Sequence, residues 1–125
     1  MIGNKYLQEL FDYKDEDTAM NQLLEYLKNK DKSFIKSLYK DLDLNKCNKK
    51  EIDFLTKATA LVDYYLQIHN LEIPDWIRDD RLEFNTPYFH SKRIDDIKKI
   101  KLLYSSPAPF SARNVYFELE GIHRV

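Results

Sequence analysis

Glycine is scarce in this chain, with 2 residues in 125. Phosphate-binding loops, dinucleotide-binding turns and the nucleophile elbow all need glycines at fixed positions, and none of these motifs is present. β-Sandwiches and barrels need many turns, whereas the chain holds only 2 glycines and 4 prolines. The composition therefore favours helices and argues against the common nucleotide-binding and hydrolase sites.

Cysteine and long apolar runs are also nearly absent. The single cysteine, Cys47, excludes an intramolecular disulfide. The sequence has no early apolar run preceded by positive charge, which is the pattern of a signal peptide. We therefore expect a cytoplasmic protein. No apolar stretch reaches the roughly 20 residues of a membrane-spanning helix, because Asp63 interrupts the longest one. We therefore expect no membrane association.

Metal-binding and nucleic-acid-binding patterns are missing too. The three histidines, His69, His90 and His123, lie far apart in the sequence and form no paired motif. A structural zinc site needs about four ligands, which isolated histidines and one cysteine do not supply, so we expect neither a metal nor a cofactor. The 20 basic and 21 acidic residues balance each other and are scattered, so we expect no direct nucleic-acid binding.

The stretch from residue 48 to 76 is the most apolar part of the chain and the centre of the predicted fold. Between Ile52 and Ile68, apolar side chains cover nearly every direction around a helix, which predicts a helix buried on all sides. Asn48 and Glu51 have the spacing of a capping box at its start. The sequence therefore predicts one central helix with the other elements around it.

We predict an all-α fold for the whole chain. It would be a compact single-domain bundle of about five to six helices around the central buried helix, with ordered aromatic loops in the C-terminal half. A length of 125 residues suits one domain. Within residues 1–125, the N-terminal helices would occupy residues 1–47, and the central helix and the C-terminal part would occupy residues 48–125.

Periodicity and capping residues predict the remaining elements. Helices are expected over 4–13, from a cap at Asp17 or Thr18, from a cap at Ser33, over 74–78, after Ser91 and over 110–113, and an extended segment over 114–117. The helix after Ser91 has one largely apolar face, formed by Ile94, Ile97, Ile100, Lys101 and Tyr104, and places Lys98 and Lys99 on another. Residues 79–90 lack periodicity and should form an ordered loop pinned by Phe84, Tyr88 and Phe89.

Asp63 is the most informative single carboxylate. It interrupts the apolar half of the central helix, where an unpaired charge is costly to bury. One hypothesis is that it is a buried catalytic acid. The hypothesis that we favour is an ion pair with Arg78, Arg81 or Arg113, or a side chain that reaches the helix surface, since structural ion pairs are common at such positions.

Four segments of the C-terminal half carry a family resemblance. They are residues 73–79 (IPDWIRD), 87–89 (PYF), 106–110 (SPAPF) and 113–117 (RNVYF). In this order and spacing they resemble the pattern of an uncharacterised bacterial family of small helical proteins, and the resemblance covers residues 60–125. The chain departs from the pattern at Asp80, where proline is usual, and at Tyr88, where tryptophan is usual.

This resemblance implies a function in protein binding. Some members of the family carry a helix-turn-helix domain in front, and some are similar to the first partner of a two-gene module with a nucleotidyltransferase-like protein. The resemblance thus implies a non-catalytic, antitoxin-like protein that binds and neutralises a toxin of the nucleotidyltransferase-like kind. Because interfaces favour aromatic residues and arginine, the candidate contact residues are Trp76, Arg78, Tyr88, Phe89, Arg113, Asn114 and Tyr116.

Two alternatives stay open at this point. The same aromatic residues, Trp76 and Phe89 above all, would also serve to pin the loops to the central helix. A second functional hypothesis is a small enzyme or nucleic-acid-processing protein with Asp63, His69 or His90 in its site. A cleft that gathers Asp63 with a histidine would support that second hypothesis.

Overall fold

A computed structural model describes residues 1–13, 15–29, 38, 41–90 and 94–117. The side chain of Trp76 also lies outside the described part. Three sequence predictions therefore fall on residues that are not described: the helix expected from Ser33, the cap at Ser91 and the position of His123.

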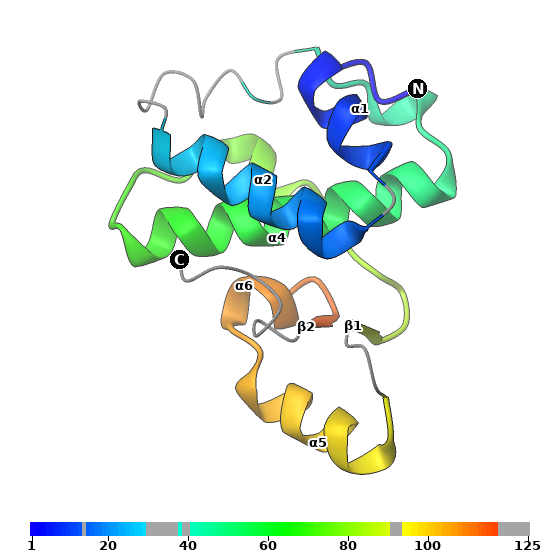
Figure 1. The fold of residues 1–125 in the computed structure, drawn as a ribbon, viewed down its shortest axis with the longest axis vertical. Helices are drawn as coiled ribbons and strands as arrows, with labels where there is room; N and C mark the ends of the chain where they lie inside the picture. The colour runs from blue at the N-terminus through cyan, green and yellow to red at the C-terminus, as the bar shows by residue number, and fades with distance from the viewer. Residues whose placement is uncertain (14, 30–37, 39–40, 91–93, 118–125) are drawn as a thin grey trace.

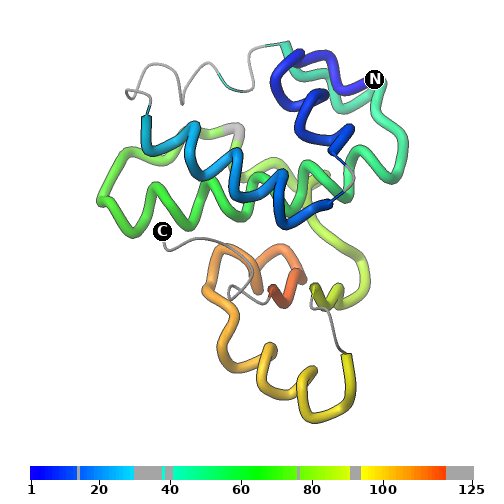
Figure 2. The backbone as a smooth tube through the Cα atoms, in the orientation of Figure 1, coloured from blue at the N-terminus to red at the C-terminus, as the bar shows by residue number. Residues whose placement is uncertain are grey.

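The described residues form five α-helices, two short 3-10 helices and two short strands (Figures 1 and 2). In chain order these are α1 (Lys5–Phe11), α2 (Glu16–Asn29), η1 (Leu44–Lys46), α4 (Lys49–Ile68), η2 (Asp75–Arg78), β1 (Tyr88–His90), α5 (Asp96–Ser105), α6 (Ala108–Ser111) and β2 (Val115–Phe117). The fold is thus mostly helical, as the composition indicates.

The prediction of a purely all-α protein is wrong, because β1 and β2 pair as a small parallel sheet. Phe89 on β1 lies opposite Tyr116 on β2. The extended segment predicted over 114–117 contains β2 and is confirmed, whereas the three residues of β1 are all half-buried and show no alternation, so residues 88–90 were expected to belong to a loop. Parallel strands also need a long crossover connection, which here contains α5 and α6.

Helix α4 is the central buried helix that the sequence predicts. Every residue from Phe54 to Asp63 is buried. The predicted capping box is confirmed: the side chain of Asn48 accepts a hydrogen bond from the amide of Glu51 at 2.9 Å, and the carboxylate of Glu51 accepts one from the amide of Asn48 at 2.9 Å. The local sequence therefore determines where α4 begins, and packing on all sides stabilises the rest of the helix.

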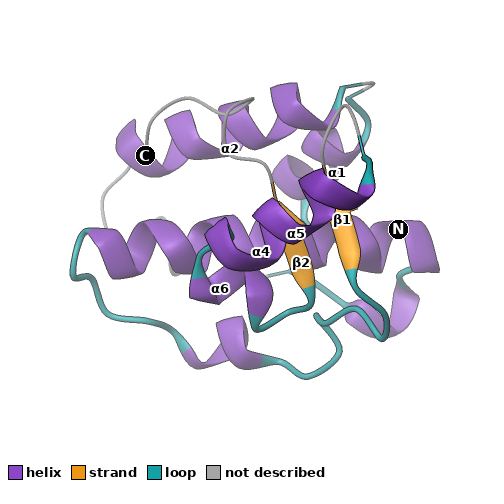
Figure 3. Cartoon of the chain, turned by 90° about the horizontal axis from the view of Figure 1, so that it is seen from below, coloured by secondary structure: helices purple, strands orange, loops and turns teal. Residues whose placement is uncertain are grey.

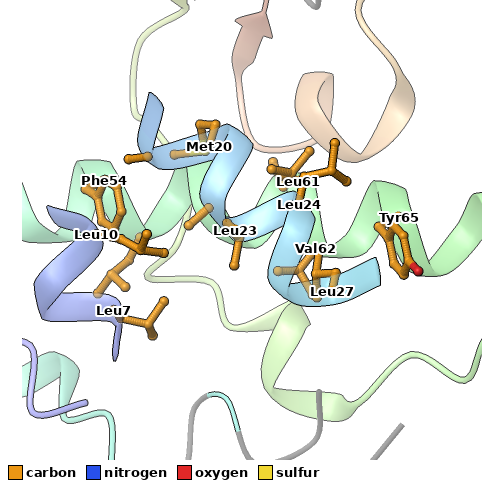
Figure 4. Packing of buried hydrophobic residues seen from close by; sticks show 14 of the residues in the cluster. Leu7, Leu10, Met20, Leu23, Leu24, Leu27, Phe54, Leu61, Val62 and Tyr65 are labelled. Atoms are coloured by element: carbon orange, nitrogen blue, oxygen red, sulfur yellow. The ribbon is translucent and has the colours of Figure 1, made fainter. Parts of the chain in front are cut away.

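The main core lies between α2 and α4, with α1 closing one end (Figures 1 and 4). Leu23, Leu24 and Leu27 project from α2 toward Leu61 and Val62 of α4 (Figure 4). All five side chains are at most 1% exposed. The narrow leucine stripe of α2 thus covers one side of the central helix.

Several predicted helix boundaries need correction. Helix α2 begins at Glu16 rather than after a cap at Asp17 or Thr18, because Asp15 supplies the capping carboxylate, which accepts from the amide of Asp17 at 3.1 Å and from the hydroxyl of Thr18 at 2.9 Å. Helix α5 follows a cap at Asp95. The short helix expected over 110–113 lies at Ala108–Ser111 instead. These shifts leave the order of the elements unchanged.

In Figure 1, α5, α6 and the two strands lie below α4, and His90 of β1 also contacts the start of α2. Helix α6 packs against α4, β2 packs against α6, and α5 packs against β2. In the view from below, α5 lies across the strands on the outer side of the sheet (Figure 3). Helix α5 is consequently the outermost element of this part of the protein.

No helix in the described residues combines the length and apolar character needed to cross a membrane.

Candidate functional site

Asp63 forms a buried ion pair with Arg113, one of the three partners predicted for it. A guanidinium nitrogen of Arg113 donates to the carboxylate of Asp63 at 3.0 Å. The same guanidinium donates to the carbonyl oxygens of Pro109 at 2.7 Å and Ile77 at 2.6 Å, and the side chain of Gln67 donates to the other carboxylate oxygen of Asp63 at 2.9 Å. Arg113 thus connects α4, η2 and α6 from inside the protein.

A cleft of about 320 Å³ borders this ion pair. Its wall includes the exposed residues Arg78, Asp80 and Glu83. No histidine is among the described residues that line it. Because Asp63 and Arg113 satisfy each other, the geometry supports a structural role for Asp63.

A second network of charged side chains connects α2, α4 and β1. Lys57 pairs with Glu16 and donates to the hydroxyl of Tyr88 at 3.2 Å. The ring of His90 lies between two carboxylates, with Nδ1 3.3 Å from Glu16 and Nε2 2.9 Å from Asp17. The Lys57 side chain is only 7% exposed, so leaving its ammonium without this pairing would be costly.

The geometry around His90 favours a charged ring. A neutral imidazole carries one N–H and can donate to one of the two carboxylates, whereas the imidazolium donates to both. Burial of the ring opposes its charge, but the hydrogen bonds to Glu16 and Asp17 outweigh this effect and hold the pKa of His90 above its ordinary value of 6.5. Burial likewise opposes the charge of Glu16, and the contacts with His90 and Lys57 hold the pKa of Glu16 below its ordinary value.

The raised pKa of His90 predicts a pH-dependent stability. A group with a higher pKa in the folded state stabilises the protein fully below its unfolded value, near 6.5, and this stabilisation is lost as pH rises through the folded pKa. We therefore expect the free energy of unfolding to fall as pH increases from about 6.5 toward the folded pKa. Urea unfolding at a series of pH values measures it.

His90→Gln is the matched variant for this prediction, because glutamine keeps one donor but does not titrate. The variant should be less stable than the wild type near pH 6, and the difference should shrink as pH rises. A difference that is constant from pH 6 to pH 9 would show that the imidazolium contributes nothing to folding.

Helix α5 carries an apolar face that points away from the protein. Its only buried residue is Leu102, whereas Ile97 is 69%, Ile100 55%, Leu103 47% and Tyr104 89% exposed. At about 100° per residue, these four side chains fall within an arc of about 120°, and Leu102 lies about 160° from its centre. We call Ile97, Ile100, Leu103 and Tyr104 the outward face of α5.

Two lysines border the outward face of α5. On the helical projection, Lys101 follows about 40° beyond Ile97 on one edge, and Lys99 follows about 40° beyond Leu103 on the other. The ammonium of Lys99 also lies 5.7 Å from the ring centre of Phe89. The ring of Phe89 stacks on that of Tyr116, with 5.2 Å between the ring centres. These two half-buried rings therefore lie next to α5, near Lys99.

The predicted contact residues occupy different environments. Phe89 and Tyr116 are half-buried beside α5, and Arg78 is exposed at the cleft near Asp63. Tyr88 contacts Lys57 and stacks on Phe84 at 4.9 Å. The guanidinium of Arg113 is bound inside the protein. Asn114 has a left-handed backbone conformation, and its side-chain amide donates to the carbonyl oxygen of Phe84 at 3.3 Å. Trp76 is described only through its backbone, in η2.

The three residues of the enzyme hypothesis contact different sets of neighbours. Asp63 pairs with Arg113. His69 is the exposed C-terminal cap of α4, and its ring lies 4.4 Å from that of Tyr65. His90 contacts the carboxylates at the start of α2. Among the described residues, the lining of the cleft beside Asp63 includes neither His69 nor His90.

Sequence reasoning missed the outward face of α5 as a candidate site. The helical spacing of Ile97, Ile100 and Tyr104 was visible in the sequence, but periodicity does not show whether the protein or a partner covers an apolar face.

Comparisons with known proteins found no matching family model, no similar curated protein and no similar solved structure.

Proposed function

We propose that this chain is a non-catalytic interaction protein that binds another protein through the outward face of α5. The observation that carries this proposal is the exposure of four large apolar side chains on one side of a helix that buries only Leu102. Contiguous apolar surface of this kind marks interaction sites in soluble proteins, whereas single exposed apolar residues need no explanation.

The finer proposal is an antitoxin-like protein that neutralises a nucleotidyltransferase-like toxin in the cytoplasm. The C-terminal family resemblance supports it, because α5 lies between the segments 87–89 and 106–110 of that pattern. Phe89 and Tyr116, two aromatic residues of the pattern, lie beside α5. Neutralisation would occur by direct contact, which either covers the nucleotide pocket of the toxin or holds it in an inactive assembly.

Co-expression with the protein encoded by the neighbouring gene tests this function. If that protein is a nucleotidyltransferase-like toxin, we expect it to stop growth when expressed alone. Co-expression of this chain should restore growth, and the two proteins should co-purify as a stable complex. Normal growth with the neighbour alone, together with no affinity between the two purified proteins, would exclude the antitoxin-like function.

A further inference from the structure

We propose that α5 binds by insertion into an apolar groove on the partner protein, and that acidic side chains line both rims of this groove. This inference rests on the proposed function, since it specifies the kind of surface that the partner presents. Three features of α5 carry it: its position, the width of its apolar stripe and the placement of its lysines.

Helix α5 is placed so that a partner can enclose it. It is the outermost element beyond the small sheet (Figures 1 and 3), and Leu102 is its only buried residue. Together with Lys99 and Lys101, the outward face covers an arc of about 200°, more than half of the helix circumference. A flat surface contacts one side of a helix only. A groove contacts Ile97 and Leu103 at the two edges of the stripe at the same time.

The spacing of the apolar residues is that of helices that bind in grooves. Ile97, Ile100 and Tyr104 follow one another at i, i+3 and i+7, and anchors at this spacing enter a hydrophobic groove from one side of a helix. Tyr104 is the most exposed of them, at 89%, and tyrosine is enriched among residues that dominate binding energy. We expect Tyr104 and Ile97 to contribute most to affinity.

The lysines specify the charge of the groove rims. Lys99 and Lys101 lie on opposite edges of the apolar stripe, so each faces one rim when the stripe is buried. Acidic rims would complement both, because opposite charges across an interface favour the correct partner and like charges oppose it. The acidic residues Asp95 and Asp96 lie at the N-terminal end of α5, where the groove should end in a basic residue or a hydrogen-bond donor.

A second copy of this chain fits the outward face of α5 poorly. A helix of ten residues is about 15 Å long, and two such helices side by side bury a few hundred Å² each, below the roughly 800 Å² per partner of a stable interface. An antiparallel pair brings each lysine edge against the same edge of its copy. A parallel pair brings Lys101 against Lys99. Both arrangements place like charges together, which is unfavourable.

Photo-crosslinking from α5 tests the proposal. In the full chain, produced in its natural host cells, Tyr104 is replaced by p-benzoylphenylalanine and irradiated. We expect an adduct with a different protein, mapped by mass spectrometry to apolar residues bordered by aspartate or glutamate on both sides. Adding Ile97→Glu should remove this adduct. The same photo-crosslinker at Ile68, which is 44% exposed at the far end of α4, is the matched control and should not yield it.

Other outcomes overturn the inference. These are an adduct with a second copy of the chain, an adduct with lipid, an adduct on a surface without flanking acidic residues, or no adduct. An adduct that persists with Ile97→Glu also overturns it, provided that thermal unfolding shows this variant to be as stable as the wild type.

Affinity measurements with the captured partner separate this inference from the antitoxin-like function. Ile97→Glu should weaken binding by at least about 30-fold, and Lys99→Glu with Lys101→Glu should weaken it and reduce its salt dependence. A toxin complex that is unaffected by Ile97→Glu would leave the antitoxin-like function intact but refute both binding through the outward face of α5 and the groove. An acid-rimmed groove on a protein without toxicity would support the groove and refute neutralisation.

Discussion

Replacing Arg113 with alanine is expected to lower the free energy of unfolding by about 3–5 kcal/mol. The substitution leaves the carboxylate of Asp63 buried without a counter-ion and removes the donor from the carbonyl oxygens of Pro109 and Ile77. Buried polar groups without partners cost most of their desolvation energy. Urea denaturation followed by circular dichroism measures the change, which is a large part of the stability of a domain.

Two variants make this prediction specific to the ion pair. Arg78→Ala, at an exposed arginine, should change stability by less than about 0.5 kcal/mol. The double variant Asp63→Leu with Arg113→Met should recover most of the loss, because well-packed apolar residues often replace a buried ion pair without cost. Equal effects of Arg113→Ala and Arg78→Ala would show that the pair does not connect α4, η2 and α6 energetically.

The second large effect is expected from Glu16→Ala, with a loss of about 2–3 kcal/mol. Without Glu16, the ammonium of Lys57 keeps only the hydroxyl of Tyr88 among the partners described here, and His90 keeps only Asp17. The loss should be smaller than for Arg113 because the Glu16 side chain is 27% exposed, which lets water replace part of the interaction. Chemical denaturation at pH 7 gives the value.

Glu25→Ala is the matched control, since Glu25 is an exposed glutamate on the same helix. This substitution should leave the free energy of unfolding nearly unchanged. Adding Lys57→Met to Glu16→Ala should restore part of the stability, because the unpaired ammonium is then removed. If the double variant is no more stable than Glu16→Ala, the loss does not come from the buried charge of Lys57.

The elements set by local chemistry were predictable from the sequence. Helix α4 was predicted because its apolar residues run around the whole helix and because Asn48 and Glu51 have the spacing of a capping box. The pairing of Asp63 was predictable as a requirement, since a buried carboxylate needs a partner. The sequence did not predict which of the three arginines would be the partner of Asp63, because that choice depends on how the turn after α6 packs against α4.

The elements set by tertiary structure were not predictable in this way. Strand β2 lies within the extended segment predicted over 114–117, but β1 was expected to be part of a loop, and the pairing of the two strands depends on the connection through α5 and α6. Arg113 and Tyr88, chosen as contact residues for their side-chain types, contact Asp63 and Lys57 respectively, and the sequence did not predict the contact between Tyr88 and Lys57. The sequence placed Tyr104 on a helical face, but periodicity alone does not show that this face is exposed.

Helix α5 has one buried residue, Leu102, and this has a consequence for how the protein can diversify. The residues of the outward face of α5 are exposed and lie on a different element from Arg113 and the α2–α4 core, so the effects of their substitution on stability should add to those at Arg113 or in the core. Partner preference can therefore change by a few surface substitutions while the fold is retained. The same separation makes α5 a position where recognition can be redesigned without repacking the protein.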